Sequence, residues 1–192
     1  MKSNDFLAFL ENLSAISRNG LFYTKNSYDK DRYQKVLDLV ELAYTQVGDI
    51  EKHASNQFKK IDFITPKVGV NIAIMEEDNI LIAKRKDDGL WELPGGWAEI
   101  GETAIDCIQR EILEELNLRV NVLKVVDVFC RLPKSSEEYV TSYHILYCGE
   151  IIDGNFQESS ETSEIKWIKK EDVSSIQWHK DHMNLAIAAF NF

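Results

Sequence analysis

The chain has 192 residues, of which 44% are hydrophobic and 28% are charged. This composition is typical of a folded globular protein and excludes a collagen-like or intrinsically disordered chain, because apolar burial can offset the entropy lost on folding. Lys and Arg number 22 against 32 Asp and Glu, so the formal net charge is −10. This excess argues against nonspecific nucleic-acid binding, although metal ions could still supply the positive charge that phosphate chemistry needs.

No segment has the pattern of a secretion signal or a membrane span. The apolar stretch Phe6–Leu10 ends at Glu11, whereas a signal peptide needs about 7–15 apolar residues and a spanning helix about 20. The three cysteines, Cys107, Cys130 and Cys148, form no CxxC pair, and we expect them to be reduced. The sequence therefore predicts a cytoplasmic protein that does not cross a membrane.

Before Pro66 the sequence predicts helices. Apolar residues recur at helical spacing over 6–16, and Gly20 follows as a stop signal. Asp29 is expected to cap a second helix, and a shorter helical piece is expected over 49–58.

After Pro66 the pattern changes to strands and helices. Strands are expected over 67–75, 80–84, 119–132, 139–152 and 165–168. Helices are expected over Thr103–Leu116 and Trp178–Phe190. Residues 1–66 carry 9 basic and 9 acidic side chains, whereas residues 67–192 carry 13 and 23. We therefore predict a helical domain over 1–66 and a second, α/β domain over 67–192.

The predicted helix 103–116 carries a cluster of carboxylates beside its apolar stripe. Glu111, Glu114 and Glu115 are separated by three and four residues, so they share one side of the helix and repel one another. Bound divalent cations would relieve this repulsion, and an all-carboxylate set favours Mg²⁺ or Mn²⁺ over zinc. The turn Leu93-Pro94-Gly95-Gly96 precedes the helix and lets the backbone approach a ligand closely.

These residues resemble the Nudix box. Gly96, five residues, Glu102, seven residues, and then the run from Arg110 to Leu118 match eight of its nine specified positions. The exception is Asn117, where the family has Gly at the end of the helix. Asn tolerates the left-handed conformation wanted there, so we expect a small stability cost and no loss of chemistry.

The resemblance implies a Nudix α/β/α sandwich with a mixed sheet and gives roles to the residues of the box. Glu111, Glu114 and Glu115 would bind Mg²⁺ or Mn²⁺, with the Gly95 carbonyl as an extra ligand. Glu102 and Arg110 would form an ion pair that, with Gly96, supports the loop and helix.

The general base and the phosphate-binding residues stay open. The base could be Glu111, Glu115 or Glu161, the last because some Nudix enzymes take it from the loop before Trp167, although that loop could simply be solvated. Lys84 and Arg85 could contact phosphate or could form an exposed strand end. Several aromatic residues could stack a nucleobase or anchor loops: Trp91, Trp97, Phe129 and Tyr143.

The segment Gly20–Tyr33 resembles the helical N-terminal region of a Nudix subgroup that hydrolyses X-linked nucleoside diphosphates. This resemblance implies a homodimer and a pyrophosphohydrolase with CDP-choline or ADP-ribose as leading substrates. The alternatives are a Nudix-like module that senses such a ligand without cleaving it and an RNA-processing Nudix enzyme. The complete set of three glutamates argues against the sensor.

Overall fold

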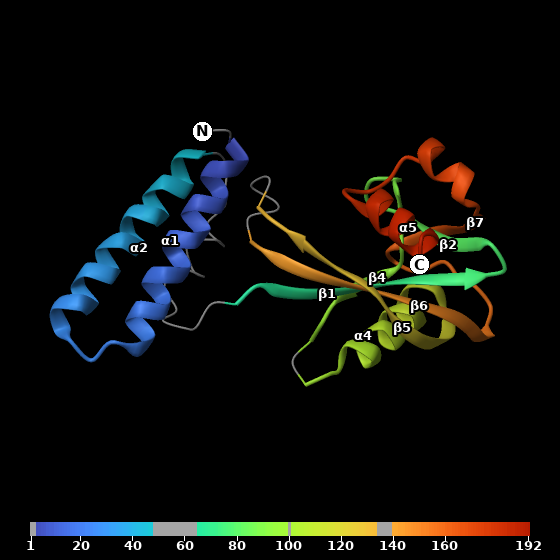
Figure 1. Ribbon diagram of the computed structural model, residues 1–192, viewed down its shortest axis with the longest axis horizontal. Coiled ribbons are helices and arrows are strands. Elements are labelled where there is room, and N and C mark those ends of the chain that lie inside the picture. The colour runs from blue at the N-terminus through green and yellow to red at the C-terminus, as the bar shows by residue number, and fades with distance from the viewer. Residues whose placement is uncertain (1–2, 48–64, 100, 134–139) are drawn as a thin grey trace. The chain divides into compact units, whose positions relative to one another are not determined.

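The computed structural model describes residues 3–47, 65–99, 101–133 and 140–192 (Figure 1). These residues form two compact units. Unit 1 contains Met1–Lys67 and Cys130–Ser142, and unit 2 contains Val68–Phe129 and Tyr143–Phe192. The helical piece predicted over 49–58 lies outside the described residues.

Unit 1 is built on two helices, α1 (Ser3–Tyr23) and α2 (Ser27–Val47), which pack along each other (Figure 1). Their common core consists of four buried side chains, which are Leu7, Leu10, Val40 and Tyr44. Burial of this stripe stabilises the helix pair, because most of the stability of helices in proteins comes from packing of an apolar face.

Two predictions about the ends of these helices are wrong. Gly20 does not stop α1, which continues to Tyr23. Instead, Gly20 allows the ring of Tyr33 to pack against the helix backbone, since a Cβ atom at this position would lie 2.4 Å from the ring. Asp29 does not cap α2, because the Oδ1 atom of Asn26 accepts the Tyr28 N–H at 2.8 Å and begins the helix earlier.

Unit 1 also contains residues 130–142, which the sequence places in the second domain. The carboxylate of Glu11 in α1 accepts hydrogen bonds from both the backbone N–H and the hydroxyl of Thr141. A carboxylate that accepts two hydrogen bonds from one residue ties this segment to the helix.

Within the described residues, seven strands form one sheet with the order β3-β2-β1-β6-β5, in which β4 also pairs with β1 and β7 with β2. The strands are β1 (Lys67–Glu76), β2 (Asn79–Arg85), β3 (Trp91–Glu92), β4 (Gly95–Trp97), β5 (Leu118–Arg131), β6 (Ser142–Gly154) and β7 (Thr162–Ile168). Of the two shortest strands, β3 precedes the predicted glycine turn, and β4 begins within it at Gly95.

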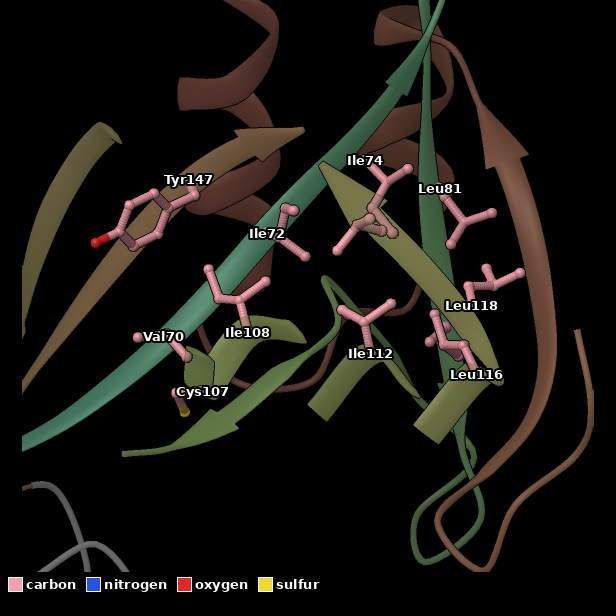
Figure 2. Packing of buried hydrophobic residues seen from close by; sticks show 12 residues of the cluster. Val70, Ile72, Ile74, Leu81, Cys107, Ile108, Ile112, Leu116, Leu118 and Tyr147 are labelled. Carbon is pink, nitrogen blue, oxygen red and sulfur yellow. The ribbon is translucent and has the colours of Figure 1, made fainter. Parts of the chain in front are cut away.

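Helices cover both faces of this sheet. Helix α4 (Ala104–Leu116) packs on the face that carries Val70 and Ile72, as Figure 2 shows. Helix α5 (His182–Phe190) packs with Ala73 and Ile80 in a separate cluster. Because neighbouring residues of a strand face opposite sides, the two clusters lie on opposite faces. The predicted α/β/α sandwich is therefore confirmed.

Helix α4 is capped at both ends by its own sequence. The Thr103 hydroxyl accepts the Asp106 N–H at 3.2 Å, and the Asp106 carboxylate accepts the Thr103 N–H at 3.1 Å. Asn117 ends the helix in the left-handed conformation with φ of 55°. The helix thus runs nearly as predicted, from Ala104 to Leu116.

The last helix is shorter than predicted. The backbone around Trp178 pairs with β3, since the Trp91 N–H donates to Gln177 O at 2.9 Å and the His179 N–H donates to Trp91 O at 2.8 Å. These bonds delay the start of α5 to His182. A 3-10 helix, η1 (Lys170–Ser175), was not predicted. Among the helices of the described ranges, none has the length and apolarity required to cross a bilayer.

The helix end at Asn117 gives a test of the local fold. We expect Asn117→Ala to lower the free energy of unfolding by about 1–3 kcal/mol, because Ala is strained at positive φ and lacks the amide that donates to Asn155 O at 3.0 Å. Asn117→Gly loses the same hydrogen bond without the strain and should lose less stability. Urea denaturation measures both, and equal losses would contradict the strain argument.

Candidate active site

The glycine turn, residues 93–96, is fixed by buried side chains from two distant elements. The Leu93 N–H donates to Nδ1 of His182 at 3.0 Å, and the Leu93 carbonyl accepts from Nδ2 of Asn71 at 3.1 Å. His182 and Asn71 are both buried. The peptide groups on either side of Leu93 are therefore held before the chain reaches the acidic helix.

Two glycines let this turn approach its neighbours more closely than any side chain would permit. Gly95 has a φ of 144°, and a Cβ atom there would lie 2.1 Å from the carbonyl oxygen of Val70. A Cβ atom at Gly96 would lie 2.2 Å from Oε1 of Glu111. The carboxylate of Glu111 thus occupies the space directly against the backbone of Gly96.

Glu115 is the most deeply buried carboxylate of α4. It is 7% exposed, and its Oε2 atom accepts the Gly95 N–H at 3.4 Å. Burial, followed by the negative charges of Glu92 and Glu111, raises the pKa of Glu115 to about 9. A positive charge placed beside this group would favour its ionised form.

Glu111 and Glu114 both form ion pairs with Arg110 in the same helix. Arg110 Nη1 lies 2.9 Å from Oε1 of Glu111 and 3.4 Å from Oε2 of Glu114. Burial raises the pKa of Glu111, whereas the side chain of Glu114 is 62% exposed. Glu111 therefore faces the glycine turn, and Glu114 lies on the solvent side of Arg110.

Arg110 also joins the helix to the loop that precedes it. Its guanidinium donates to the two carboxylate oxygens of Glu102 at 2.8 and 3.1 Å and to the Trp97 carbonyl at 3.2 Å. Glu102 accepts the Glu99 N–H at 2.6 Å as well, and its bond with Arg110 lowers its pKa to about 2. This bidentate pair holds the loop and helix together.

The carboxylates are chemically suited to bind a divalent cation, but their side chains are not arranged as a complete coordination site. Within the described ranges, no three Asp, Glu, His or Cys side chains converge as a ready metal site, since Arg110 draws Glu111 and Glu114 to itself. Glu111 and Glu115 nevertheless combine burial, mutual repulsion and oxygen-only donors beside the glycine turn. Such a donor set suits Mg²⁺ or Mn²⁺.

The loop before β7 brings a further carboxylate within electrostatic reach. Glu161 is held by its backbone, which donates to Oγ of Ser159 at 3.2 Å and accepts the Lys86 N–H at 2.8 Å. The negative charge of Glu161 contributes to the raised pKa values of both Glu111 and Glu115. Glu161 is therefore within electrostatic reach of Glu111 and Glu115.

The two basic residues at the end of β2 have different surroundings. Arg85 is surrounded by acidic groups, because Nη1 lies 3.1 and 3.2 Å from the two oxygens of Glu92 and the guanidinium also bonds Asp87. Lys84 Nζ lies 3.5 Å from Glu164 and 5.6 Å from the centre of the Trp91 ring. The donors of Arg85 are therefore engaged by carboxylates.

Sequence reasoning missed three residues that build the site: Asn71, Glu92 and His182. Glu92 is 8% exposed and electrostatically coupled to Glu115, and burial raises its pKa. Asn71 could have been noticed, because it is a polar residue between Val70 and Ile72 in an apolar strand. His182 has no such signal, since it reaches Leu93 from 89 residues away.

Comparison with curated proteins finds relatives that match about half to two thirds of the chain. YjhB of Bacillus subtilis is 35% identical over 107 residues, which is 55% of this chain and 51% of YjhB. An ADP-ribose pyrophosphatase of Methanocaldococcus jannaschii is 28% identical over 123 residues, which is 62% of this chain and 70% of that protein. The chain thus spans about half the length of YjhB.

Solved structures share the fold. A crystal structure of UDP-X diphosphatase superposes with a TM-score of 0.57 at 24% identity and covers 100% of this chain and 96% of its own. An ADP-ribose pyrophosphatase from Streptococcus suis superposes with a TM-score of 0.51 at 25% identity, covering 65% of this chain and 92% of its own.

Two family models match consecutive parts of the chain. Residues 4–51 match the UDP-X-like, N-terminal oligomerisation domain. Residues 65–188 match the NUDIX domain, which includes the glycine turn, α4 and the loop of Glu161. Since that model covers well over half of the sequence, the chain belongs to the Nudix family.

Proposed function

We propose that this protein is a divalent-metal-dependent pyrophosphohydrolase that cleaves the diphosphate of an X-linked nucleoside diphosphate into a nucleoside monophosphate and phosphorylated X. The observation that carries this proposal is the position of the buried Glu115 and the partly buried Glu111, whose carboxylates lie directly against the backbone of Gly95 and Gly96. The ADP-ribose pyrophosphatase relatives favour ADP-ribose, and CDP-choline is the second candidate.

Glu111 and Glu115, with Glu114 and the Gly95 carbonyl, would hold the cation, which we propose to be Mg²⁺ or Mn²⁺. When bound, it would supply positive charge to the diphosphate and lower the pKa of the attacking water. Hydrolysis adds the water oxygen to one phosphorus and breaks that phosphorus' bond to the bridging oxygen. The ion pair of Glu102 and Arg110 keeps the helix in register with the turn and does not itself touch substrate.

Glu161 is our candidate for the general base. Its loop is anchored to Lys86 and its charge reaches both Glu111 and Glu115, so it can accept a proton from water near them. Lys84 is our candidate for a phosphate contact. We favour it over Arg85, because the Arg85 donors already bind Glu92 and Asp87.

A substrate panel tests the function directly. With Mg²⁺ or Mn²⁺ present, we expect nucleoside monophosphate to be released from ADP-ribose, CDP-choline or a UDP-linked sugar, and EDTA to abolish release. Tight binding of such ligands without turnover of any would favour a sensing module. Turnover restricted to 5′-capped or triphosphorylated RNA would favour the RNA-processing alternative.

Substitution of single carboxylates on α4 tests the metal assignment in the same panel. Glu114→Gln and Glu115→Gln should each lower kcat/KM by about 100-fold or more, because an amide is a poor ligand for a hard cation. Both should also lose the rise in unfolding temperature that Mg²⁺ gives the unaltered protein. The exposed Glu171→Gln serves as control and should change neither quantity. Undiminished turnover would refute the metal assignment.

The assignment of Glu161 is tested separately by Glu161→Gln. We expect kcat to fall by about 100-fold, within the usual contribution of a general base, while the Mg²⁺-dependent thermal shift is retained. Glu158→Gln on the same loop removes only the ion pair with Lys86 at 2.8 Å and should leave kcat close to that of the unaltered protein. Equal effects of the two substitutions would argue for a general loss of loop structure.

We also propose that the protein is a homodimer assembled through its N-terminal helices. Residues 4–51 match an oligomerisation domain, and several large apolar side chains of these helices are exposed: Phe9, Ile16, Phe22, Leu39 and Leu42. A cytoplasmic location remains a prediction from the free cysteines.

Light scattering coupled to size-exclusion chromatography should give twice the mass of one chain. Leu39→Asp, at a side chain that is 66% exposed, should shift this mass toward that of the monomer, because it places a charge in a proposed apolar interface. Asp38→Asn on the neighbouring position is the control. A monomeric mass for the unaltered protein would overturn the proposal.

A further inference from the structure

An exposed tryptophan stands directly beside the glycine turn. Trp97 follows Gly96 at the end of β4, and 50% of its surface is exposed although it belongs to an otherwise well-packed unit. Its carbonyl accepts hydrogen bonds from Arg110 at 3.2 Å and from the thiol of Cys107 at 3.4 Å. The backbone of Trp97 is therefore anchored to helix α4, while half of the side chain remains accessible.

The indole ring is oriented by a buried histidine. The rings of Trp97 and His144 meet edge to face, with their centres 5.2 Å apart and their planes at 62°. His144 is 6% exposed and lies flat against β1 at Gly69, where a Cβ atom would be 2.6 Å from Cε1 of the imidazole. The imidazole cannot move toward β1, so it forms a rigid support for the indole.

The same histidine is linked to the glycine turn through Asn71. Because Asn71 donates its Nδ2 to the Leu93 carbonyl, its Oδ1 must accept from Nδ1 of His144, 3.1 Å away. The buried side chain amide of Asn71 therefore bonds both the glycine turn and His144, the residue that supports the exposed indole.

We propose that the exposed indole of Trp97 is the stacking surface for the nucleobase of the substrate. This inference rests on the proposed function, because a diphosphate at Gly95 and Gly96 leaves its base to one side, separated from it by the ribose. Alternation along β4 directs Trp97 away from the side on which Gly96 meets Glu111. The ring can thus contact the base without occupying the space of the diphosphate.

The other aromatic candidates are less suited to this role. Trp91 packs against the core cluster of α5 and lies under Lys84, and Phe129 packs against the same cluster. Tyr143 is 44% exposed but faces the opposite side of the sheet from the imidazole of His144, so its ring does not have the support that His144 gives to Trp97.

The test compares ligands with and without a base. Trp97→Leu should weaken the binding of AMP, CMP or UMP by about 5- to 100-fold, the range expected for loss of one stacked base. Trp97→Tyr should retain binding within about threefold, since the aromatic face remains, and Tyr143→Leu should bind as the unaltered protein does. Inhibition by inorganic pyrophosphate should be unchanged in all three variants. For a hydrolysed substrate, Trp97→Leu should raise KM and leave kcat the same.

Fluorescence gives a second measurement that does not depend on activity or on the Leu variant. A stacked base quenches indole emission, and the difference between the unaltered protein and Trp97→Phe isolates Trp97 from the other three tryptophans. We expect nucleotide quenching to be largely lost in Trp97→Phe. The inference would be overturned if nucleotides quenched both proteins equally or did not bind at all. It would also be overturned if Trp97→Leu weakened the inhibition by pyrophosphate as much as it weakened nucleotide binding.

The results also separate this inference from the proposed function. Hydrolysis of a nucleoside diphosphate with a KM that is unaffected by Trp97→Leu would refute the stacking role alone. Nucleotide binding that depends on Trp97, without hydrolysis of any compound in the panel, would refute the enzyme and leave the stacking surface in place.

Discussion

The close contact between the glycine turn and the acidic helix is the constraint on which the rest of the site depends. Gly95 must fit against the Val70 carbonyl and Gly96 against the carboxylate of Glu111, and neither position has room for a Cβ atom. The capping of α4 by Thr103 sets where that carboxylate lies along the helix. Packing, helix capping and backbone geometry therefore together fix the position of the Glu111 carboxylate against the glycine turn.

The electrostatics of this region favour a bound cation, although the domain as a whole is acidic. Arg110 forms ion pairs with Glu102 and Glu111, whereas the buried Glu115 accepts, among the described residues, only a long hydrogen bond of 3.4 Å from the Gly95 N–H. Burial accordingly dominates the pKa of Glu115. A bound cation would offset both the negative charge of Glu111 and Glu115 and that of a diphosphate.

Local features were predictable from the sequence, and long-range ones were not. The caps at Thr103 and Asn117 are encoded by neighbouring residues, so the limits of α4 could be predicted to within a residue. Gly20 was misread, because its role depends on the ring of Tyr33, which belongs to the next helix. The bond from Leu93 to His182 crosses 89 residues and leaves no pattern in either segment.

The composition of unit 1 has a consequence for recombination between family members. This unit combines residues 1–67 with residues 130–142, and the carboxylate of Glu11 binds Thr141 twice across that separation in sequence. A chimera that exchanges only the N-terminal helices would join a foreign α1 to the native Thr141 and break this match. A compatible exchange therefore requires three crossover points, one near residue 67 and one at each end of residues 130–142.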